Sequence, residues 1–233
     1  MESQSNDYRL ERWLAVLLSL LFFLPFVARA DDIVLANMTY HGEEMPYGDG
    51  EEFLALTPAC VLVPVKIGVT TVHDDIVDAE GESTGKSVSV PVLDEGTVLM
   101  RGAKLVAGKV IPADPDFVEL APRSWQATIA LGSAQSSLYY RCDDAECTLV
   151  LETGDASQDL VTIPILRRGR EINTMDVEHT INFAGDLDHD GRLDLVANVP
   201  SHWNGFEMTL FLSSAAEPGQ LVGRAAELLM TGC

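Results

Sequence analysis

An acidic loop late in the chain carries the residues that could do metal chemistry. Its aspartates occupy the first, third, fifth and ninth positions of the loop: Asp186, Asp188, Asp190 and Asp194. Calcium is a hard cation that takes oxygen ligands in a flexible cage, and alternating carboxylates supply such ligands. Gly191, in the sixth position, permits the sharp turn that the loop needs. The spacing therefore predicts a calcium site in which the four carboxylates and the backbone carbonyl of Arg192 bind one ion.

The loop differs from an EF-hand at its twelfth position. An EF-hand has a bidentate Glu there, whereas this chain has Ala197. Residues 195–199, which follow the loop, favour a strand rather than the helix of an EF-hand. The alternative that stays open is an acidic hairpin turn without metal, because Asp and Gly favour turns in any case. Carboxylates this closely spaced exceed what a turn requires, and they would repel one another without a cation.

The loop also resembles an FG-GAP repeat, the calcium-binding unit of integrin-type β-propellers. Phe183, Gly185 and Asp186 match the F-x-G-D lead-in of that repeat, and the resemblance covers roughly residues 181–213. It implies ligands from loop positions one, three, five, seven and nine, which are the five residues given above. A propeller repeats this unit in several blades. The sequence contains one copy, so a complete propeller is not expected.

Short β-strands are the elements that would position this loop. Apolar, often β-branched runs recur along the chain with Gly and Pro between them, which is typical of an all-β sandwich or barrel. The expected strands lie within 33–35, 61–69, 87–92, 97–100, 104–110, 117–120, 124–131, 137–141, 147–152, 160–166, 180–183, 194–199, 208–212 and 221–229. Pro64 predicts an edge strand or a bulge in its run, and the run 221–229 also suits a helix.

A proline-containing, acidic stretch from residue 112 to residue 122 predicts a boundary between two lobes. We therefore expect two small antiparallel, sandwich-like β lobes, residues 31–122 and residues 123–233. The second lobe would carry the calcium-loop hairpin at residues 186–194.

The first thirty residues have the pattern of a secretory signal peptide. Arg9 and Arg12 precede an apolar run from residue 13 to residue 27, and Ala28-Arg29-Ala30 provides an A-x-A cleavage site. The apolar run is too short for a membrane span, which needs about 20 residues. We expect cleavage of residues 1–30, a periplasmic or secreted protein, and no stable membrane insertion. The alternative is an uncleaved N-terminal anchor, because acidic residues dilute the positive flank.

The charge of the chain limits its partners. The formal net charge is −21 at pH 7. Such a chain is repelled by nucleic acid and by anionic lipid, so neither is an expected partner. We expect instead a protein or glycan ligand of the cell envelope or the extracellular space.

The cysteines predict disulfides, because an even number in an exported chain favours pairing. They are Cys60, Cys142, Cys147 and Cys233. Cys142 and Cys147 flank a hairpin tip, and Cys233 ends the chain, where a bond to Cys60 would tie the terminus down. We therefore expect the pairs Cys142–Cys147 and Cys60–Cys233. A zinc site at Cys142 and Cys147 is the alternative, although no second Cys/His pair accompanies them.

One motif suggests an enzyme. Residues 81–85 match the G-x-S-x-G of a nucleophile elbow, with Ser83 as the nucleophile. That elbow needs a strand before the serine and a helix after it, whereas residues 87–90 favour a strand. The sequence thus favours an exported, calcium-binding, all-β protein that acts as a non-enzymatic binding or structural module. The alternative is a hydrolase that uses Ser83 on a surface polymer or an ester.

Overall fold

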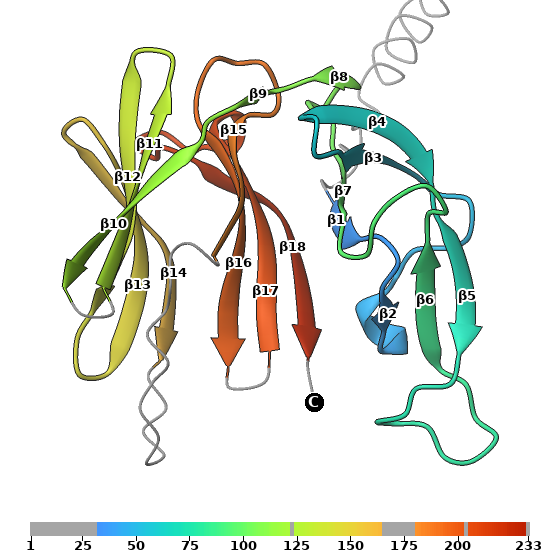
Figure 1. Ribbon diagram of the computed structural model, residues 1–233. Helices are drawn as coiled ribbons and strands as arrows, with labels where there is room; N and C mark the ends of the chain where they lie inside the picture. Colours follow the sequence, from blue (N-terminus) through green and yellow to red (C-terminus); the bar gives the residue numbers. More distant parts are fainter. Residues whose placement is uncertain (1–31, 122–123, 165–179, 203–204, 232–233) are drawn as a thin grey trace, which may run out of the picture.

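The computed structural model describes residues 32–121, 124–164, 180–202 and 205–231. The predicted signal peptide, residues 1–30, and Cys233 lie outside the described residues. Within them, β-strands dominate, and the two labelled exceptions are the 3-10 turns η1 (Gly42–Glu44) and η2 (Ser213–Ala215). The prediction of an all-β, sandwich-like fold is confirmed (Figure 1).

The N-terminal part forms two antiparallel sheets. Its strands are β1 (Asp32–Leu35), β2 (Thr39–Tyr40), β3 (Glu52–Leu56), β4 (Val61–Lys66), β5 (Gly68–Val72), β6 (Gly85–Ser89), β7 (Val98–Arg101) and β8 (Gly108–Lys109). One sheet has the order β1-β7-β3-β4-β8 and the other the order β2-β6-β5. β8 pairs only with Val61 and Leu62 of β4. Pro64 therefore lies where this edge of β4 has no described partner strand, and an unpaired edge tolerates a proline.

The C-terminal part forms two five-stranded antiparallel sheets. Its strands are β9 (Ile111–Pro112), β10 (Pro115–Ala121), β11 (Ser124–Leu131), β12 (Ala134–Cys142), β13 (Glu146–Thr153), β14 (Ala156–Pro164), β15 (Ile181–Asp186), β16 (Asp194–His202), β17 (Gly205–Leu212) and β18 (Gly223–Thr231). Strands β10 to β14 pair in chain order. The other sheet, which we call the central sheet, has the order β18-β17-β16-β15-β9.

Strand pairing joins residues 111–121, where the sequence predicts a lobe boundary, to the C-terminal strands. β9 pairs with β15 and β10 pairs with β11, so residues 111–121 belong with the C-terminal strands. The prolines that suggested a boundary lie in edge strands. Pro112 lies in β9 and Pro115 begins β10, and each of these strands is the last in its sheet. An edge strand tolerates the missing N–H of proline, so these prolines are compatible with strands.

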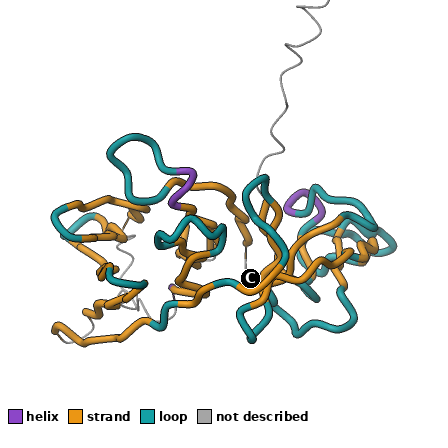
Figure 2. Tube along the Cα trace, turned by 90° about the horizontal axis from the view of Figure 1, so that it is seen from above, coloured by secondary structure: helices purple, strands orange, loops and turns teal. Residues whose placement is uncertain are grey.

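The central sheet is buried on both faces. Val196 and Leu210 belong to the core shared with the N-terminal strands, whereas Leu195 and Phe211, their neighbours in sequence, belong to the core shared with β10 to β14. This alternation follows from the two-residue period of a strand. Figures 1 and 2 show the central sheet between the other two groups of strands, so both cores depend on it.

The run 221–229, for which the sequence also allowed a helix, forms the strand β18. Ala226, Leu228 and Met230 are buried, whereas Glu227 and Leu229 between them are exposed. A period of two is the signature of a half-buried strand, and pairing with β17 overrides the local helix propensity.

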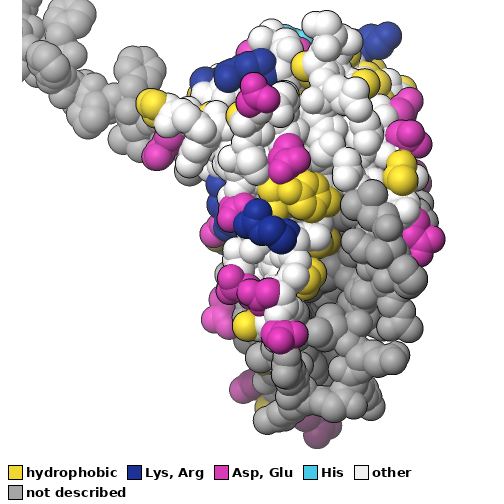
Figure 3. Space-filling model, turned by 90° about the vertical axis from the view of Figure 1, so that its left-hand side faces the viewer, with side chains coloured by type: hydrophobic (Ala, Val, Ile, Leu, Met, Phe, Trp, Pro, Cys, Tyr) yellow, Lys and Arg dark blue, Asp and Glu magenta, His cyan; other side chains and the backbone are white. Residues whose placement is uncertain are grey.

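The surface is acidic and the described chain has no membrane helix. On the side of the molecule formed by β10 to β14, Asp and Glu side chains are spread over the face among fewer Lys and Arg (Figure 3). No helix with the length and apolarity of a membrane span occurs in residues 32–121, 124–164, 180–202 or 205–231.

Candidate metal centre

The acidic loop connects two neighbouring strands of the central sheet. β15 ends at Asp186 and β16 begins at Asp194, so the first and last of the loop aspartates stand at the two strand ends. Gly185 and Asp194 are opposite each other in the antiparallel register. Figure 1 shows the loop at the end of β15, beside β9. The hairpin thereby brings together carboxylates that are separated along the chain.

Gly185 is required by the close approach of β9 at the entrance of the loop. A Cβ atom at this position would lie 2.2 Å from the carbonyl oxygen of Ile111 and 2.9 Å from the Cα of Pro112. Only glycine lets β9 pair with β15 at this point. The glycine that precedes Asp186 therefore has a steric role that fixes where the loop begins.

Three of the predicted ligands converge. Carboxylate oxygens of Asp186, Asp188 and Asp194 lie within 4.8 Å of one another. Two oxygens on opposite sides of a calcium ion are about 4.6–5.2 Å apart, because each lies 2.3–2.6 Å from the ion. Asp186 and Asp194 are buried, at 2% and 0% exposed, and Asp188 is half-buried. We call these residues the aspartate triad; their spacing could hold a metal ion, and their oxygens suit a hard cation.

Asp194 is the most buried member of the triad. The N–H of Leu187 donates a hydrogen bond to its Oδ2 at 2.8 Å, and the N–H of Ser213 donates to its Oδ1 at 2.7 Å. Burial raises the pKa of Asp194 to about 6, although these two hydrogen bonds lower it, and the nearby charge of Asp188 adds to the rise. Such a carboxyl lacks a compensating positive charge, which a bound cation would supply.

Asp186 is enclosed by the backbone of its own loop. The N–H of Gly191 donates to its Oδ2 at 3.0 Å, and the N–H of Asp190 donates to its Oδ1 at 3.1 Å. Gly191 has a φ of +80°, as expected for the sharp turn, and His189 has a φ of +65° with its side chain exposed. The loop therefore wraps around Asp186 and holds its carboxylate next to the other two.

Asp190 and Arg192 are placed differently from the triad. The Ser213 hydroxyl donates to the Asp190 carboxylate oxygens at 2.9 and 2.8 Å, and the Arg192 guanidinium donates to Oδ2 at 3.0 and 2.7 Å. Burial alone would raise the pKa of Asp190, but these hydrogen bonds lower it overall. Asp190 thus links the loop to η2. The metal-ligand roles of Asp190 and of the Arg192 carbonyl stay predictions.

Ser213 and Ser214, in η2, are the site residues that sequence analysis missed. Ser213 contacts two of the aspartates, as described above, and the Ser214 hydroxyl donates to the carboxylate of Asp188. Lys104 donates to the carbonyl of Ser214 at 2.7 Å, which ties η2 to the N-terminal part. Serine is common in turns that follow an apolar strand, so a serine at these positions does not by itself indicate a metal site. Only the pairing of β16 with β17 brings η2 to the loop.

Cys142 and Cys147 form the predicted disulfide. They lie opposite each other in the β12–β13 hairpin, with Cα atoms 4.0 Å apart. Cys60 forms no disulfide with any described residue. Its predicted partner, Cys233, lies outside the described residues, so the Cys60–Cys233 pair stays a prediction.

The G-x-S-x-G motif lies in the loop between β5 and β6. Ser83 is exposed, and strand β6 begins at Gly85, where a nucleophile elbow has its helix. His73, in the same loop, forms a hydrogen bond through Nδ1 with the carbonyl of Glu82 at 2.8 Å. The strand that the sequence favours after the serine is therefore confirmed, and this histidine contacts the backbone beside the serine.

No family model, no curated protein and no solved structure matches the chain.

Proposed function

We propose that the chain is an exported calcium-binding protein that acts as a non-enzymatic binding or structural module in the periplasm or outside the cell. The observation that carries this proposal is the aspartate triad, whose carboxylate oxygens lie within 4.8 Å of one another. Calcium is the proposed metal, because aspartates at alternating loop positions provide a flexible cage of hard oxygen ligands.

The electrostatics of the triad support a bound cation. Within the described part of the chain, no basic side chain forms an ion pair with the triad, and the arginine of the loop, Arg192, pairs with Asp190. Two carboxylates 4.8 Å apart repel each other by on the order of 3 kcal/mol at an effective dielectric constant of about 20. A divalent cation between them replaces this repulsion with attraction.

The proposed role of calcium is to fasten the central sheet. An ion bound to the triad would join the end of β15, through Asp186, to the start of β16, through Asp194. Asp188 would extend this link to η2, because it already accepts a hydrogen bond from Ser214. Both hydrophobic cores include residues of this sheet. Calcium would therefore stabilise the whole described chain, and not only the loop.

The full ligand set that we propose follows the FG-GAP resemblance. The backbone carbonyl of Arg192 and the carboxylate of Asp190 would complete the cage around the triad. Asp190 would have to turn from its hydrogen bonds with Ser213 and Arg192 to do so. Its contribution to calcium affinity is therefore expected to be smaller than that of Asp186, whose carboxylate is already in place.

Export and a non-enzymatic role have separate support. A disulfide such as Cys142–Cys147 persists in oxidising compartments, and residues 1–30 have the pattern of a signal peptide. The exposure of Ser83 and the strand that follows it favour the module over the hydrolase. The hydrolase alternative requires an esterase or glycosidase activity that Ser83→Ala removes.

Thermal melts and calorimetry in chelator, calcium and magnesium test the proposal. Calcium should raise the melting temperature, and magnesium should do so poorly, because it demands a tighter octahedral site. Asp186→Ala should abolish calcium binding, and Asp190→Ala should weaken it less. Asp155→Ala, at an exposed aspartate in the β13–β14 turn, is the matched control and should bind like the wild type. Identical melts in chelator and in millimolar calcium, with no heat of binding, would contradict the proposal.

A further inference from the structure

β18 is the last strand of the central sheet and has an open edge. It pairs with β17 from Gly223 to Thr231, and no described strand pairs with its other edge. β1 and η1 lie against β18 without joining its sheet. An unpaired edge presents a row of backbone N–H and C=O groups, which can form hydrogen bonds with one more strand.

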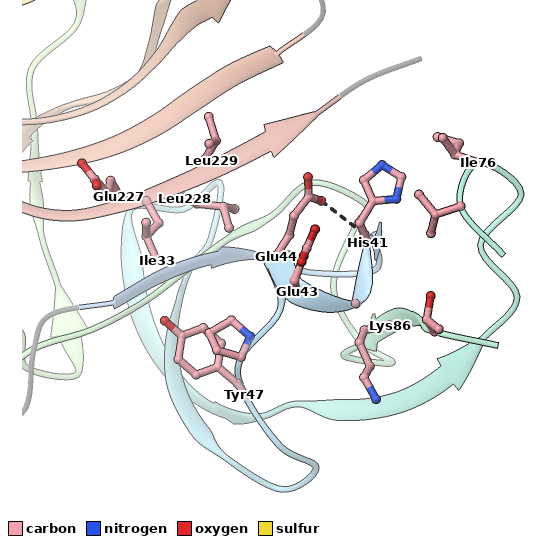
Figure 4. Close-up of a pocket in the computed structure, with 14 residues that line it drawn as sticks. Ile33, His41, Glu43, Glu44, Tyr47, Ile76, Lys86, Glu227, Leu228 and Leu229 are labelled. Carbon is pink, nitrogen blue, oxygen red and sulfur yellow. Dashed lines mark hydrogen bonds between the residues drawn. The ribbon is translucent and has the colours of Figure 1, made fainter.

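This edge borders a cleft of about 1070 Å³. Figure 4 shows β18 along one side of the cleft, with η1 and the loop between β5 and β6 on the other. Pockets for small molecules measure about 300–1,000 Å³, so this volume is large enough for a peptide segment. Glu227, Leu228 and Leu229 are consecutive in β18 and all line the cleft. A ligand that lies along the strand would contact such a row.

Exposed apolar side chains stand at the rim of the cleft. Ile76 and Val77, in the β5–β6 loop, are 55% and 62% exposed, and Leu229 of β18 is 50% exposed. Leu228 and Ile33, which also line the cleft, are buried. Apolar residues that gather around a hollow on an otherwise polar surface mark an interaction site.

Carboxylates dominate the charge of the cleft. Glu43, Glu44 and Glu227 line it, against Lys86, whose ammonium group donates to a threonine hydroxyl at 3.0 Å, and His41, whose ring pairs with Asp74. Arg224, which does not line the cleft, donates to Glu227. The net charge of the whole chain is −21. Both the local and the total charge therefore favour a basic ligand.

The wall opposite β18 is held in place before any ligand binds. His41, at the start of η1, forms a hydrogen bond through Nδ1 with Oδ2 of Asp74 at 2.5 Å. Asp74 is buried at the base of the β5–β6 loop and accepts the N–H of Ile76 at 3.0 Å. This contact fixes η1 against the loop that carries the apolar rim. A preformed cleft lowers the conformational entropy that binding would cost.

We propose that an extended segment of a partner protein, in which apolar and basic side chains alternate, adds to β18 as a further strand and lies in this cleft. This inference rests on the proposed function of a binding module and specifies the chemistry of its partner. Hydrogen bonds from the main chain to the edge of β18 supply affinity, and the side chains of the cleft supply specificity. Alternate side chains of a strand point to opposite sides. One set can therefore meet the apolar rim while the other meets the carboxylates.

A capped peptide that alternates valine and lysine tests this proposal. It has nine residues, like β18, and its binding to the full exported chain in calcium is followed by fluorescence anisotropy. We expect saturable binding of one peptide per chain. N-methylation of alternate peptide amides removes main-chain hydrogen bonds and should weaken binding by about tenfold or more. Because N-methylation keeps the side chains and the charge, it separates strand addition from simple charge attraction.

Variants of the cleft test the predicted specificity. Glu43→Lys combined with Val77→Asp should weaken binding of the basic peptide by about tenfold, because each change opposes one set of its side chains. Both residues are exposed, so the fold should tolerate the changes. The matched control combines Glu119→Lys with Val92→Asp, at exposed positions outside the cleft, and should bind like the wild type.

Three outcomes would overturn the proposal. The first is equal binding of three peptides: the valine–lysine peptide, the same peptide with glutamate in place of lysine, and the N-methylated peptide. The second is wild-type affinity in the cleft variant. The third is a dimer in sedimentation experiments that excludes the peptide, since the edge would then belong to a second copy of the chain. Calcium titration of the same sample separates the two proposals: calcium binding without peptide binding refutes strand addition alone, whereas absent calcium binding refutes the proposed function.

Discussion

Replacing Asp194 by Asn removes a charge from the triad and keeps the shape of the side chain. The wild-type carboxylate accepts the backbone N–H groups of Leu187 and Ser213. In the variant the amide NH2 must face one of them, and a buried donor without an acceptor costs about 1–3 kcal/mol. Removal of the buried charge has the opposite effect and stabilises the folded state of the variant. A pKa of about 6 instead of 3.8 corresponds to roughly 3 kcal/mol in favour of the neutral form.

These two effects nearly cancel in the absence of metal. In chelator at pH 7.5, we expect Asp194→Asn and the wild type to unfold at similar temperatures. Calcium at 100 times its dissociation constant should stabilise the wild type by about 2.7 kcal/mol, which for a chain of this size raises the melting temperature by roughly 5–11 °C. The variant should gain little from calcium, because it lacks one of the converging carboxylates.

The dependence on pH gives a second check on Asp194. Its pKa is higher in the folded state than in the unfolded chain, so the folded state without metal binds the proton more tightly. The stabilisation that results is present below a pH of about 4 and is lost as the pH rises through about 6. Asp194→Asn should lose this dependence. Circular dichroism melts at pH 5 and pH 7.5, each in chelator and in calcium, measure all of these quantities.

Two results would refute the argument for Asp194. If the variant gains as much stability from calcium as the wild type, the carboxylate is not a metal ligand. If the variant unfolds far below the wild type in chelator at pH 7.5, the carboxylate serves mainly as an acceptor of backbone hydrogen bonds, and its buried charge costs less than we infer.

Three further predictions concern the rest of the described chain. Reduction of the Cys142–Cys147 disulfide should lower the free energy of unfolding by about 2 kcal/mol, because the bond closes a short loop; urea unfolding with and without reductant measures this. Gly185→Ala should cost on the order of 3 kcal/mol in the same assay, because its Cβ would lie 2.2 Å from a carbonyl oxygen of β9. Gly48→Ala, whose Cβ makes only an ordinary contact, is its control. The hydrogen bond to a carboxylate raises the pKa of His41, so the stabilisation from this pair is present below a pH of about 6.5 and is lost as the pH rises through the raised pKa. His41→Gln should therefore lose more stability at pH 5.5 than at pH 8.5.

Each of these predictions has a clear contrary result. Unchanged unfolding in reductant would mean that the disulfide adds nothing beyond the hairpin. Equal stability of Gly185→Ala and Gly48→Ala would mean that β9 can move away from β15 at no cost. A loss in His41→Gln that is the same at both pH values would mean that packing, and not the charge of the histidine, holds η1.

The sequence predicts those parts of the structure that depend on neighbours along the chain. Alternating apolar runs locate most of the strands, because a half-buried strand has a period of two. The spacing of Asp186, Asp188 and Asp194 predicts their convergence, because a hairpin loop brings its two ends together. The same local logic predicts the Cys142–Cys147 bond across the tip of a hairpin.

The parts that the sequence does not predict depend on contacts between distant segments. Ser213 and Ser214 reach the aspartates only because β17 pairs with β16. The prolines and acids of residues 112–122 predict a lobe boundary, yet residues 111–121 join the C-terminal sheets through pairs such as Pro112 with Gly185. The sequence does not indicate that the central sheet is covered on both faces either, because that depends on how three groups of strands pack.

An anomalous difference map from crystals grown in calcium tests the central claim most directly. We predict one calcium peak in the loop between β15 and β16, about 2.3–2.6 Å from carboxylate oxygens of Asp186, Asp188 and Asp194. The same map also decides whether Asp190 and the Arg192 carbonyl complete the cage. An ordered loop without a peak at millimolar calcium, with the triad contacting only water, would contradict the account and leave the loop as an acidic turn.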